Sequence, residues 1–225
     1  ASPRLIDLQR KLFNQSRRFR LAQLREGYLD FAKRRARQQA LVEAALSLIE
    51  EKGPTGFTLS EAAKNAGVTP AAVYRHFQGR EDLIVEAARQ GHEIFADLMD
   101  YAIAGGQPSA LEAIEATGRA YLAFARRFPG HYIAMFESGI SANATAELAQ
   151  AAGRSRAVLE RAATALSENI PPEKRPPPSM FSAHIWAMSH GVVELFARGK
   201  PGNNAPFPPE ELLEAGIGIY LRGLG

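Results

Sequence analysis

Six residues near position 70 combine side chains and backbone amides that could contact a nucleic acid. They are Thr69, Ala71, Ala72, Tyr74, Arg75 and His76. They share the helix face that stays exposed when Val73 and Phe77, one helical turn apart, turn inward. The hydroxyl, imidazole and guanidinium groups can hydrogen-bond phosphates or base edges, and the first amides of a helix can bind a phosphate. This face therefore predicts a surface that recognises duplex DNA.

The elements that would position this face are predicted to be three short helices followed by a long one. The first spans about 35–52 and is closed by Gly53-Pro54, and the second spans about 59–66, where Thr58 and Glu61 match a capping box. Thr69-Pro70 starts a third helix that runs to about position 77, and the long helix covers about 80–104. With a glycine turn between the second and third helices, this layout is that of a helix-turn-helix unit. Its core is predicted from Leu59, Ala62, Ala63, Ala66, Val68, Val73 and Phe77.

Apolar residues recur at helical spacing along the rest of the chain, and alternating strand patterns are nearly absent, so the fold class is predicted as all-α. Further helices are expected over about 114–128, 148–166, 179–198 and 208–224, with a short apolar segment at 131–140. Five prolines between 171 and 178 predict an extended linker, and 199–204 has the composition of a loop. We expect three parts: a basic N-terminal extension (1–34), a three-helix helix-turn-helix DNA-binding domain (35–78), and a helical ligand-binding and dimerisation domain (79–225).

The positive charge of the chain is concentrated at its N-terminus. Residues 1–37 contain 11 lysines and arginines against 3 acidic residues, whereas the net charge of all 225 residues is only +3. Such a segment favours polyanions, through phosphate contacts on DNA or the potential of an acidic membrane surface. The alternatives are a solvated or disordered extension, and a segment whose leucines and phenylalanine pack on a partner or on the body of the protein.

Several classes of protein and site are excluded or disfavoured by composition. The absence of cysteine excludes a disulfide framework, a thiolate zinc site and a cysteine nucleophile, and it fits a reducing, cytoplasmic compartment. No apolar run approaches the roughly 18 residues that a membrane helix needs. Gly-x-Ser-x-Gly, His-Glu-x-x-His and phosphate-loop motifs are missing, and His184 and His190 lack metal-ligand spacing. We therefore expect no catalytic activity, no metal, no cofactor and no membrane partner.

The helix-turn-helix segment resembles repressors of the TetR family. The matching sequence is AALSLIEEKG at 44–53, FTLSEAAKNAGVTPAAVYRHF at 57–77 and GREDL at 79–83. The resemblance implies a homodimer that contacts two successive major grooves of an operator. Residues assigned to DNA by the resemblance and the exposed face are Thr58, Ser60, Thr69, Pro70, Ala71, Ala72, Tyr74, Arg75, His76 and Arg80. Arg80 stands where the family usually has lysine, and it keeps the positive charge expected to contact a phosphate.

The C-terminal half resembles the WHG-type regulatory domain found in a subset of these repressors, through WAMSHG at 186–191, YLAFA at 121–125 and Phe128-Pro129. The resemblance implies a fold and a dimer rather than a ligand. Candidate lining residues of an effector pocket are Tyr121, Phe124, Phe128, His131, Met135, Phe136, Phe181, His184 and Trp186. The alternative for each of these is ordinary core packing. Candidate residues of the dimer seam are His190, Gly191, Glu194, Leu213 and Ile217, with His190 alternatively satisfied inside the core.

Together these features predict a dimeric repressor whose recognition helices lie about 34 to 36 Å apart. A small apolar or amphipathic effector would release it from the operator by favouring a conformer with a different spacing. Two alternatives remain open from the sequence. One is a regulator of the same fold that needs its ligand in order to bind DNA or to activate transcription. The other is a helical interaction protein that keeps the helix-turn-helix as a scaffold.

Overall fold

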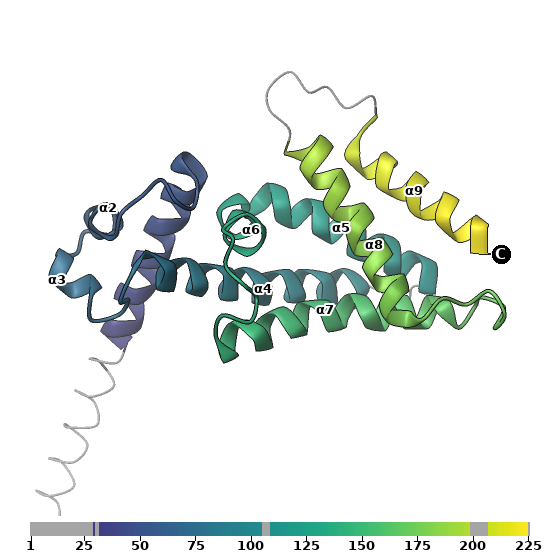
Figure 1. Ribbon diagram of the computed structural model, residues 1–225, viewed down its shortest axis with the longest axis horizontal. Helices are drawn as coiled ribbons and strands as arrows, with labels where there is room; N and C mark the ends of the chain where they lie inside the picture. The colour runs from purple at the N-terminus through teal and green to yellow at the C-terminus, as the bar shows by residue number, and fades with distance from the viewer. Residues whose placement is uncertain (1–28, 30–31, 105–108, 199–206, 225) are drawn as a thin grey trace, which may run out of the picture.

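The chain folds into helices throughout the residues that the structure, a computed structural model, describes: 29, 32–104, 109–198 and 207–224. Most of the basic N-terminal extension and the loop expected at 199–204 lie outside these residues. An N-terminal unit of short helices lies at one end of the long helix α4, and the remaining helices pack along α4 (Figure 1). The prediction of an all-α fold is confirmed for the described part of the chain.

The N-terminal unit contains a helix over 32–52, then α2 (Leu59–Asn65) and α3 (Pro70–Val73). The capping box at α2 is present: the Thr58 hydroxyl accepts from the Glu61 amide, and the Glu61 carboxylate accepts from the Thr58 amide. Gly67 turns the chain between α2 and α3 with a φ of +66°, a conformation that residues with a side chain rarely adopt. The turn residue predicted from the sequence therefore has the backbone geometry that the motif requires.

Helix α3 is shorter than the sequence predicted. It ends at Val73 rather than near Phe77, and residues 74–76 form turns. The reason is a tightened last turn, in which the amides of His76 and Phe77 both donate to the carbonyl of Val73, at 2.8 and 3.0 Å. Phe77 still reaches the core, because this turn keeps it on the buried side.

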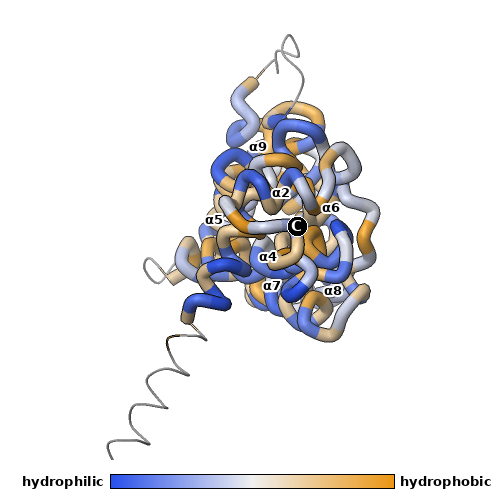
Figure 2. The backbone as a smooth tube through the Cα atoms, turned by 90° about the vertical axis from the view of Figure 1, so that its left-hand side faces the viewer, coloured by the Kyte–Doolittle hydropathy of each residue, from blue (hydrophilic) through white to orange (hydrophobic). Residues whose placement is uncertain are grey.

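The C-terminal body is built around α4 (Arg80–Ala104), which has the bounds that the sequence predicted. Three helices contact it: α5 (Ala110–Arg127), α6 (Pro129–Phe136) and α7 (Ala146–Ser167). Viewed end-on, α4 lies near the centre of this body and each surrounding helix alternates hydrophobic and hydrophilic stretches (Figure 2). Three separate helices thus bury their apolar faces against one long helix.

Two further helices complete the body: α8 (Pro178–Val192) and α9 (Pro209–Leu224). The single helix expected up to position 198 instead changes at its end into a π-helical turn, η1 (Val193–Ala197), which the Arg198 amide closes by donating to the Val193 carbonyl at 2.9 Å. The wider turn places Glu194 and Arg198 beside the ring of Tyr132 on α6. None of the described helices has the length and apolar character of a membrane span.

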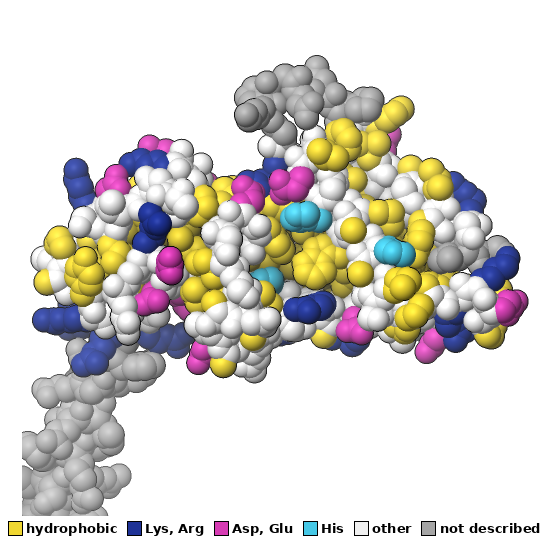
Figure 3. Space-filling model, in the orientation of Figure 1, with side chains coloured by type: hydrophobic (Ala, Val, Ile, Leu, Met, Phe, Trp, Pro, Cys, Tyr) yellow, Lys and Arg dark blue, Asp and Glu magenta, His cyan; other side chains and the backbone are white. Residues whose placement is uncertain are grey.

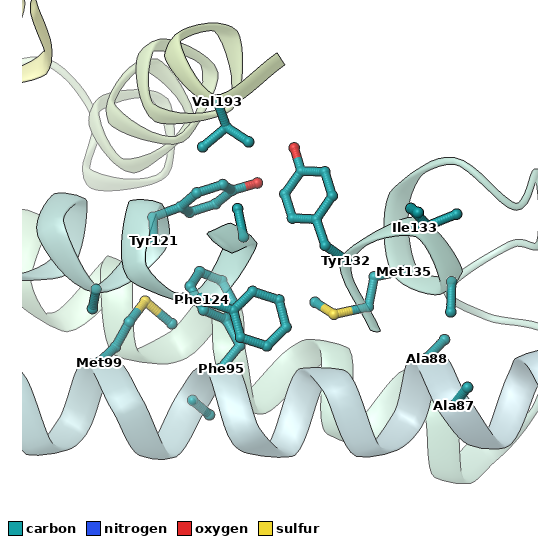
Figure 4. Packing of buried hydrophobic residues seen from close by; sticks show 14 of the residues in the cluster. Ala87, Ala88, Phe95, Met99, Tyr121, Phe124, Tyr132, Ile133, Met135 and Val193 are labelled. Atoms are coloured by element: carbon teal, nitrogen blue, oxygen red, sulfur yellow. The ribbon is translucent and has the colours of Figure 1, made fainter. Parts of the chain in front are cut away.

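An aromatic cluster joins α4, α5 and α6 at the centre of the body. The Phe95 ring lies 5.0 Å from Tyr121 and 5.1 Å from Phe124, measured between ring centroids. Figure 4 shows these rings together with Tyr132, whose hydroxyl faces that of Tyr121 below Val193. The edge-to-face arrangement of Phe95 and Tyr121 is a favourable geometry for aromatic rings and fixes their relative orientation.

Two histidines are largely buried in this core. His92 on α4 hydrogen-bonds the Ser155 hydroxyl at 3.0 Å, and burial, together with the charge of Arg156, lowers its pKa to about 4. Burial also lowers the pKa of His131 on α6 to about 4, and its Nε2 has no hydrogen-bond partner among the described residues. Both imidazoles are therefore neutral at pH 7.

These two histidines predict a loss of stability in acid. The unfolded chain takes up protons near the ordinary histidine pKa of about 6.5, whereas the folded chain resists protonation until pH 4. The free energy of unfolding thus has the full contribution of the two neutral histidines above pH 6.5. It falls as the pH drops toward 4, by roughly 2 to 4 kcal/mol for each histidine. We expect His131→Leu to flatten this decline between pH 7 and 4.5 in urea unfolding. An unchanged decline would contradict the assignment to His131.

Candidate nucleic-acid interface and effector pocket

The helix-turn-helix core is closed by the residues that the sequence predicted for it. Ala62 and Ala63 of α2 and Val73 and Phe77 at α3 are buried. The Val68 amide donates to the Ala63 carbonyl at 3.0 Å, which links the turn to α2. Because these apolar groups face inward, the opposite side of α3 is directed to solvent.

The solvent-facing side of α3 and of the turn that follows it carries the predicted recognition residues. Tyr74 is 62% exposed, Thr69, Pro70, Ala71 and Arg75 are exposed, and Ala72 and His76 are partly exposed. In Figure 3 the end of the molecule that carries α3 shows hydrophobic side chains flanked by Lys and Arg. Nearby, Ser60 is exposed, while the Thr58 hydroxyl already accepts from the Glu61 amide and donates to the Glu61 carboxylate.

Arg80 lies at the start of α4 and bonds the backbone of the N-terminal unit. Its guanidinium donates to the carbonyls of Thr55 and Phe57, at 2.8 and 3.4 Å, and its Nε is buried with no partner among the described residues. Arg80 thus holds the segment before α2 against the start of α4. The sequence indicated a positive charge at this position, but only the fold shows that backbone carbonyls satisfy it.

A second contact joins the N-terminal unit to the C-terminal body. The Glu50 carboxylate, at the end of the helix over 32–52, accepts from the Gly130 amide in the first turn of α6 at 2.9 Å. Helix α6 has no side-chain cap of its own, so Glu50 satisfies one of its free amides. A Cβ at Gly130 would lie only 2.9 Å from the Leu46 carbonyl oxygen, so the contact requires glycine.

A pocket with apolar walls lies between α4, α5, α6, α7 and α8. Its lining residues are His92, Phe95, Met99, Tyr121, Phe136, Ser155, Arg156, Leu159 and Trp186. The empty volume is about 280 Å³, but the centre of a water molecule can occupy only about 20 Å³ of it, which is space for one or two waters. In this conformation the side chains nearly fill the pocket.

Of the nine residues expected to line an effector pocket, three line this cavity: Tyr121, Phe136 and Trp186. The others are placed elsewhere. Phe124, Met135 and Phe181 are in the buried core, and Phe128 and His131 pack against each other at 6.0 Å between ring centroids. His184 is exposed and bonds the Tyr220 hydroxyl at 2.7 Å. The lining residues of α4 were missed, although His92, Phe95 and Met99 share one helix face in the sequence.

A polar network adjoins the pocket and includes residues expected at a dimer seam. His190 Nδ1 lies 2.9 Å from the hydroxyls of both Tyr121 and Tyr132, and Tyr132 donates to Glu194 at 2.7 Å. Trp186 Nε1 donates to the Tyr121 hydroxyl at 3.3 Å, which ties the network to the pocket wall. Burial raises the pKa of both tyrosines, so their hydroxyls stay protonated. Of the two alternatives for His190, the structure supports the one in the core.

Two of the other seam candidates have partners inside the protomer. Leu213 and Ile217 are buried within the protomer, over Gly118 of α5, where a Cβ would lie 2.8 Å from Leu213 Cδ2. They pack inward because α9 uses this face to cover α5. Gly191 has open space around its Cβ position, so no close approach inside the protomer explains this glycine.

Comparison with known proteins gives two family matches. Residues 41–87 match the family of bacterial regulatory proteins called the tetR family, and residues 114–220 match a tetracyclin repressor-like C-terminal domain. The chain is 36% identical over 74 residues to the HTH-type transcriptional regulator BetI of Rhizobium meliloti, an alignment that covers 33% of this chain and 35% of BetI. The chain thus spans about a third of the length of this curated relative.

Solved structures share the fold over most of the chain. A protein of unknown function from Rhodococcus sp. RHA1 is 25% identical with a TM-score of 0.71, covering 84% of this chain and 95% of that one. AibR in complex with isovaleryl coenzyme A and operator DNA is 21% identical with a TM-score of 0.61, covering 81% and 97%. Because a family match covers both the helix-turn-helix unit and most of the C-terminal body, this chain belongs to the TetR family of bacterial transcriptional regulators.

Proposed function

We propose that this protein is a dimeric repressor that binds operator DNA through α3 and is released from it by a small-molecule effector. The observation that carries the proposal is the solvent-facing side of α3. An aromatic side chain as exposed as Tyr74, at 62%, contributes little to folding, whereas it can hydrogen-bond and pack against a DNA groove. It lies beside Arg75 and His76 in the turn that follows α3, between the buried Val73 and Phe77.

Each predicted contact has a role in this proposal. Exposed Thr69, Tyr74 and Arg75, with partly exposed His76, contact the groove and its phosphates, while Pro70, Ala71 and Ala72 allow the backbone to approach closely. Ser60 and the first amides of α2 contact a phosphate, with Thr58 fixing that helix end. We assign Arg80 a positioning role, because its bonds to Thr55 and Phe57 set where α2 begins.

The three-part division remains part of the proposal. Residues 35–78 form the DNA-binding domain and 79–225 the ligand-binding and dimerisation domain, while residues 1–34 supply additional basic contacts to the duplex. The division at 78–79 separates the helix-turn-helix from α4, which starts at Arg80 and belongs to both parts through its packing.

We propose that the dimer forms through the exposed apolar side of α8, η1 and α9. Met180, Leu195 and Ile219 are 51%, 59% and 64% exposed, and Phe207, just before α9, is 58% exposed. Such large apolar side chains in one region of the surface are typical of an interface. Small or exposed residues between them, including Ala183, Ala187, Gly191 and Ala215, would let helices of two protomers approach. Figure 3 shows hydrophobic side chains at the surface near α9.

A conformational change caused by an effector would reach the DNA-binding domain through α6. Phe136, at the end of this helix, lines the pocket, and Gly130, one and a half turns earlier, contacts Glu50 and Leu46 of the N-terminal unit. A ligand that enlarges the nearly closed pocket must displace part of its wall, and a displaced α6 changes how the DNA-binding domain is held. The solved complex of AibR with a ligand and operator DNA shows that this fold can bind both.

Replacing Tyr74 tests the DNA contact. We expect Tyr74→Ala to weaken binding to a selected operator about tenfold or more, because both protomers lose a contact of about 1 kcal/mol. The unfolding free energy should be unchanged, since the side chain is largely exposed. Operators are first selected from random duplexes, and affinities are then measured by fluorescence anisotropy.

Tyr101→Ala is the matched control, because Tyr101 is an 81% exposed tyrosine on α4 outside the proposed interface. Equal affinities for wild type and Tyr74→Ala would refute the proposed contact. If no duplex is enriched, the helix-turn-helix is a scaffold or binds only with ligand, and repeating the selection with candidate ligands separates these two alternatives.

Replacing Ile219 tests the dimer surface. We expect Ile219→Glu to produce monomers in sedimentation velocity and to weaken operator binding, because a carboxylate would be buried at an apolar interface. Tyr74→Ala, at the other end of the molecule, should stay dimeric while losing DNA affinity. A dimeric Ile219→Glu protein would place the interface elsewhere.

Substituting Gly130 tests the connection through α6. We expect Gly130→Ala to lower operator affinity several-fold while the protein stays folded, because the new Cβ would push the helix over 32–52 away from α6. Gly153→Ala is the control: it lies in α7 with open space around it and should be neutral or slightly stabilising. Operator affinity and thermal unfolding are measured for both. Identical affinity for Gly130→Ala and wild type would remove α6 from the mechanism.

A further inference from the structure

The arginines of α7 differ in their partners. Arg154 forms ion pairs with Asp97 and Asp100 of α4, and Arg161 pairs with Asp100 at 2.7 Å. Arg156 is exposed and has no ion pair within the described part of the chain. It lines the pocket, whose exposed surface is almost entirely apolar, so the aliphatic stem of Arg156 forms part of the wall and its unpaired guanidinium lies on the exposed, solvent side.

The rest of the pocket offers nothing that neutralises this charge. No acidic residue is among the lining residues. Four other lining residues carry polar groups, and these bond each other in pairs: His92 with Ser155, and the Trp186 indole with the Tyr121 hydroxyl. His92 is neutral at pH 7. The pocket therefore presents one positive charge at the edge of a wall formed by Phe95, Met99 and Leu159, together with the aromatic rings of Tyr121, Phe136 and Trp186.

We propose that the effector pocket binds a small apolar monocarboxylate, whose carboxylate pairs with Arg156 and whose alkyl or aryl body lies among the aromatic side chains. The inference rests on the proposed effector-released repressor and names the ligand class of its pocket. The planar fork of a guanidinium matches the two oxygens of a carboxylate. A cation is disfavoured, since it would meet Arg156 with no acidic group to balance it.

The small size of the free pocket means that any such ligand must change the conformation of the pocket. Space for one or two waters is less than any carboxylic acid of four or more carbons needs, so the body of the acid must move the wall outward. Phe136 is the lining residue that lies on α6. Binding of the apolar body would therefore act on the helix that contacts the N-terminal unit through Gly130.

The single tryptophan of the chain makes this proposal directly measurable. Trp186 is the only tryptophan in the sequence and lines the pocket, so every change in tryptophan emission arises at one position in the pocket wall. The full-length protein is titrated with phenylacetate and octanoate and with the neutral amides phenylacetamide and octanamide. We expect the acids to change the Trp186 emission saturably and to bind roughly tenfold tighter than the amides, the size of a charge-assisted hydrogen bond.

Two variants distinguish a direct contact with Arg156 from a general effect of positive charge on α7. Arg156→Gln should bring the affinity for the acids down to that for the amides, while Arg154→Gln, two residues away and paired with Asp97 and Asp100, should bind the acids as wild type does. Equal affinity of Arg156→Gln and wild type for the acids would overturn the proposal, and so would equal affinity for acids and amides. A coenzyme A thioester such as isovaleryl coenzyme A that binds where the free acids do not would also overturn it.

Failure of this inference is distinguishable from failure of the proposed function. The fluorescence titration needs no DNA, and selection of an operator needs no ligand. If the protein binds an operator but Trp186 does not respond to the acids, the proposed ligand class is wrong and the proposed DNA-binding function stands. If Trp186 responds saturably to the acids but the protein enriches no duplex, the carboxylate site stands and the proposed repressor function is wrong.

Discussion

Helix α4 is the element on which both parts of the molecule depend. Its first turn packs in the helix-turn-helix core through Leu83 and Ile84, and its second half carries Phe95 and Met99 on the pocket wall. In a continuous helix of 25 residues, a movement of one end either moves the other end as well or bends the helix between them. Burial of its apolar face against α5, α6 and α7 therefore sets both the position of α3 and the size of the pocket.

Helix α6 adds a second connection, shorter than α4 and with polar character. Its first turn depends on the Glu50 carboxylate, and the buried hydroxyl of Tyr132 depends on His190 and Glu194. Each of these groups is costly to leave without a partner, so the helix has few alternative positions of similar energy. A ligand that displaces Phe136 acts on the last residue of a short helix whose first half is held by these contacts, so a displacement at the pocket can reach the N-terminal unit.

The arginines of the described residues differ in whether the protein supplies a partner for the guanidinium. Arg80 donates to two backbone carbonyls, Arg154 and Arg161 pair with carboxylates on α4, and Arg198 contacts Glu137 and the ring of Tyr132. Arg75 on α3 and Arg156 at the pocket are exposed, and neither forms an ion pair within the described residues. These two positions coincide with the surfaces where we propose anionic partners, the phosphates of DNA and a carboxylate.

The sequence by itself determined where most helices begin and the helix-turn-helix layout, because these depend on local signals, whereas the ends of α3 and α8 differ from the prediction. The capping box at Thr58, the Thr69-Pro70 start, the Gly67 turn and the 3.6-residue spacing of buried groups act within a few residues of each other. Only the tertiary structure decided which partners the buried faces meet. Periodicity shows that Leu213 and His190 face inward, but α5 and α6, far away in the sequence, decide that they pack within the protomer. The same reason explains why Arg80 bonds carbonyls, and why residues 92, 95 and 99 line the pocket while Phe181 does not.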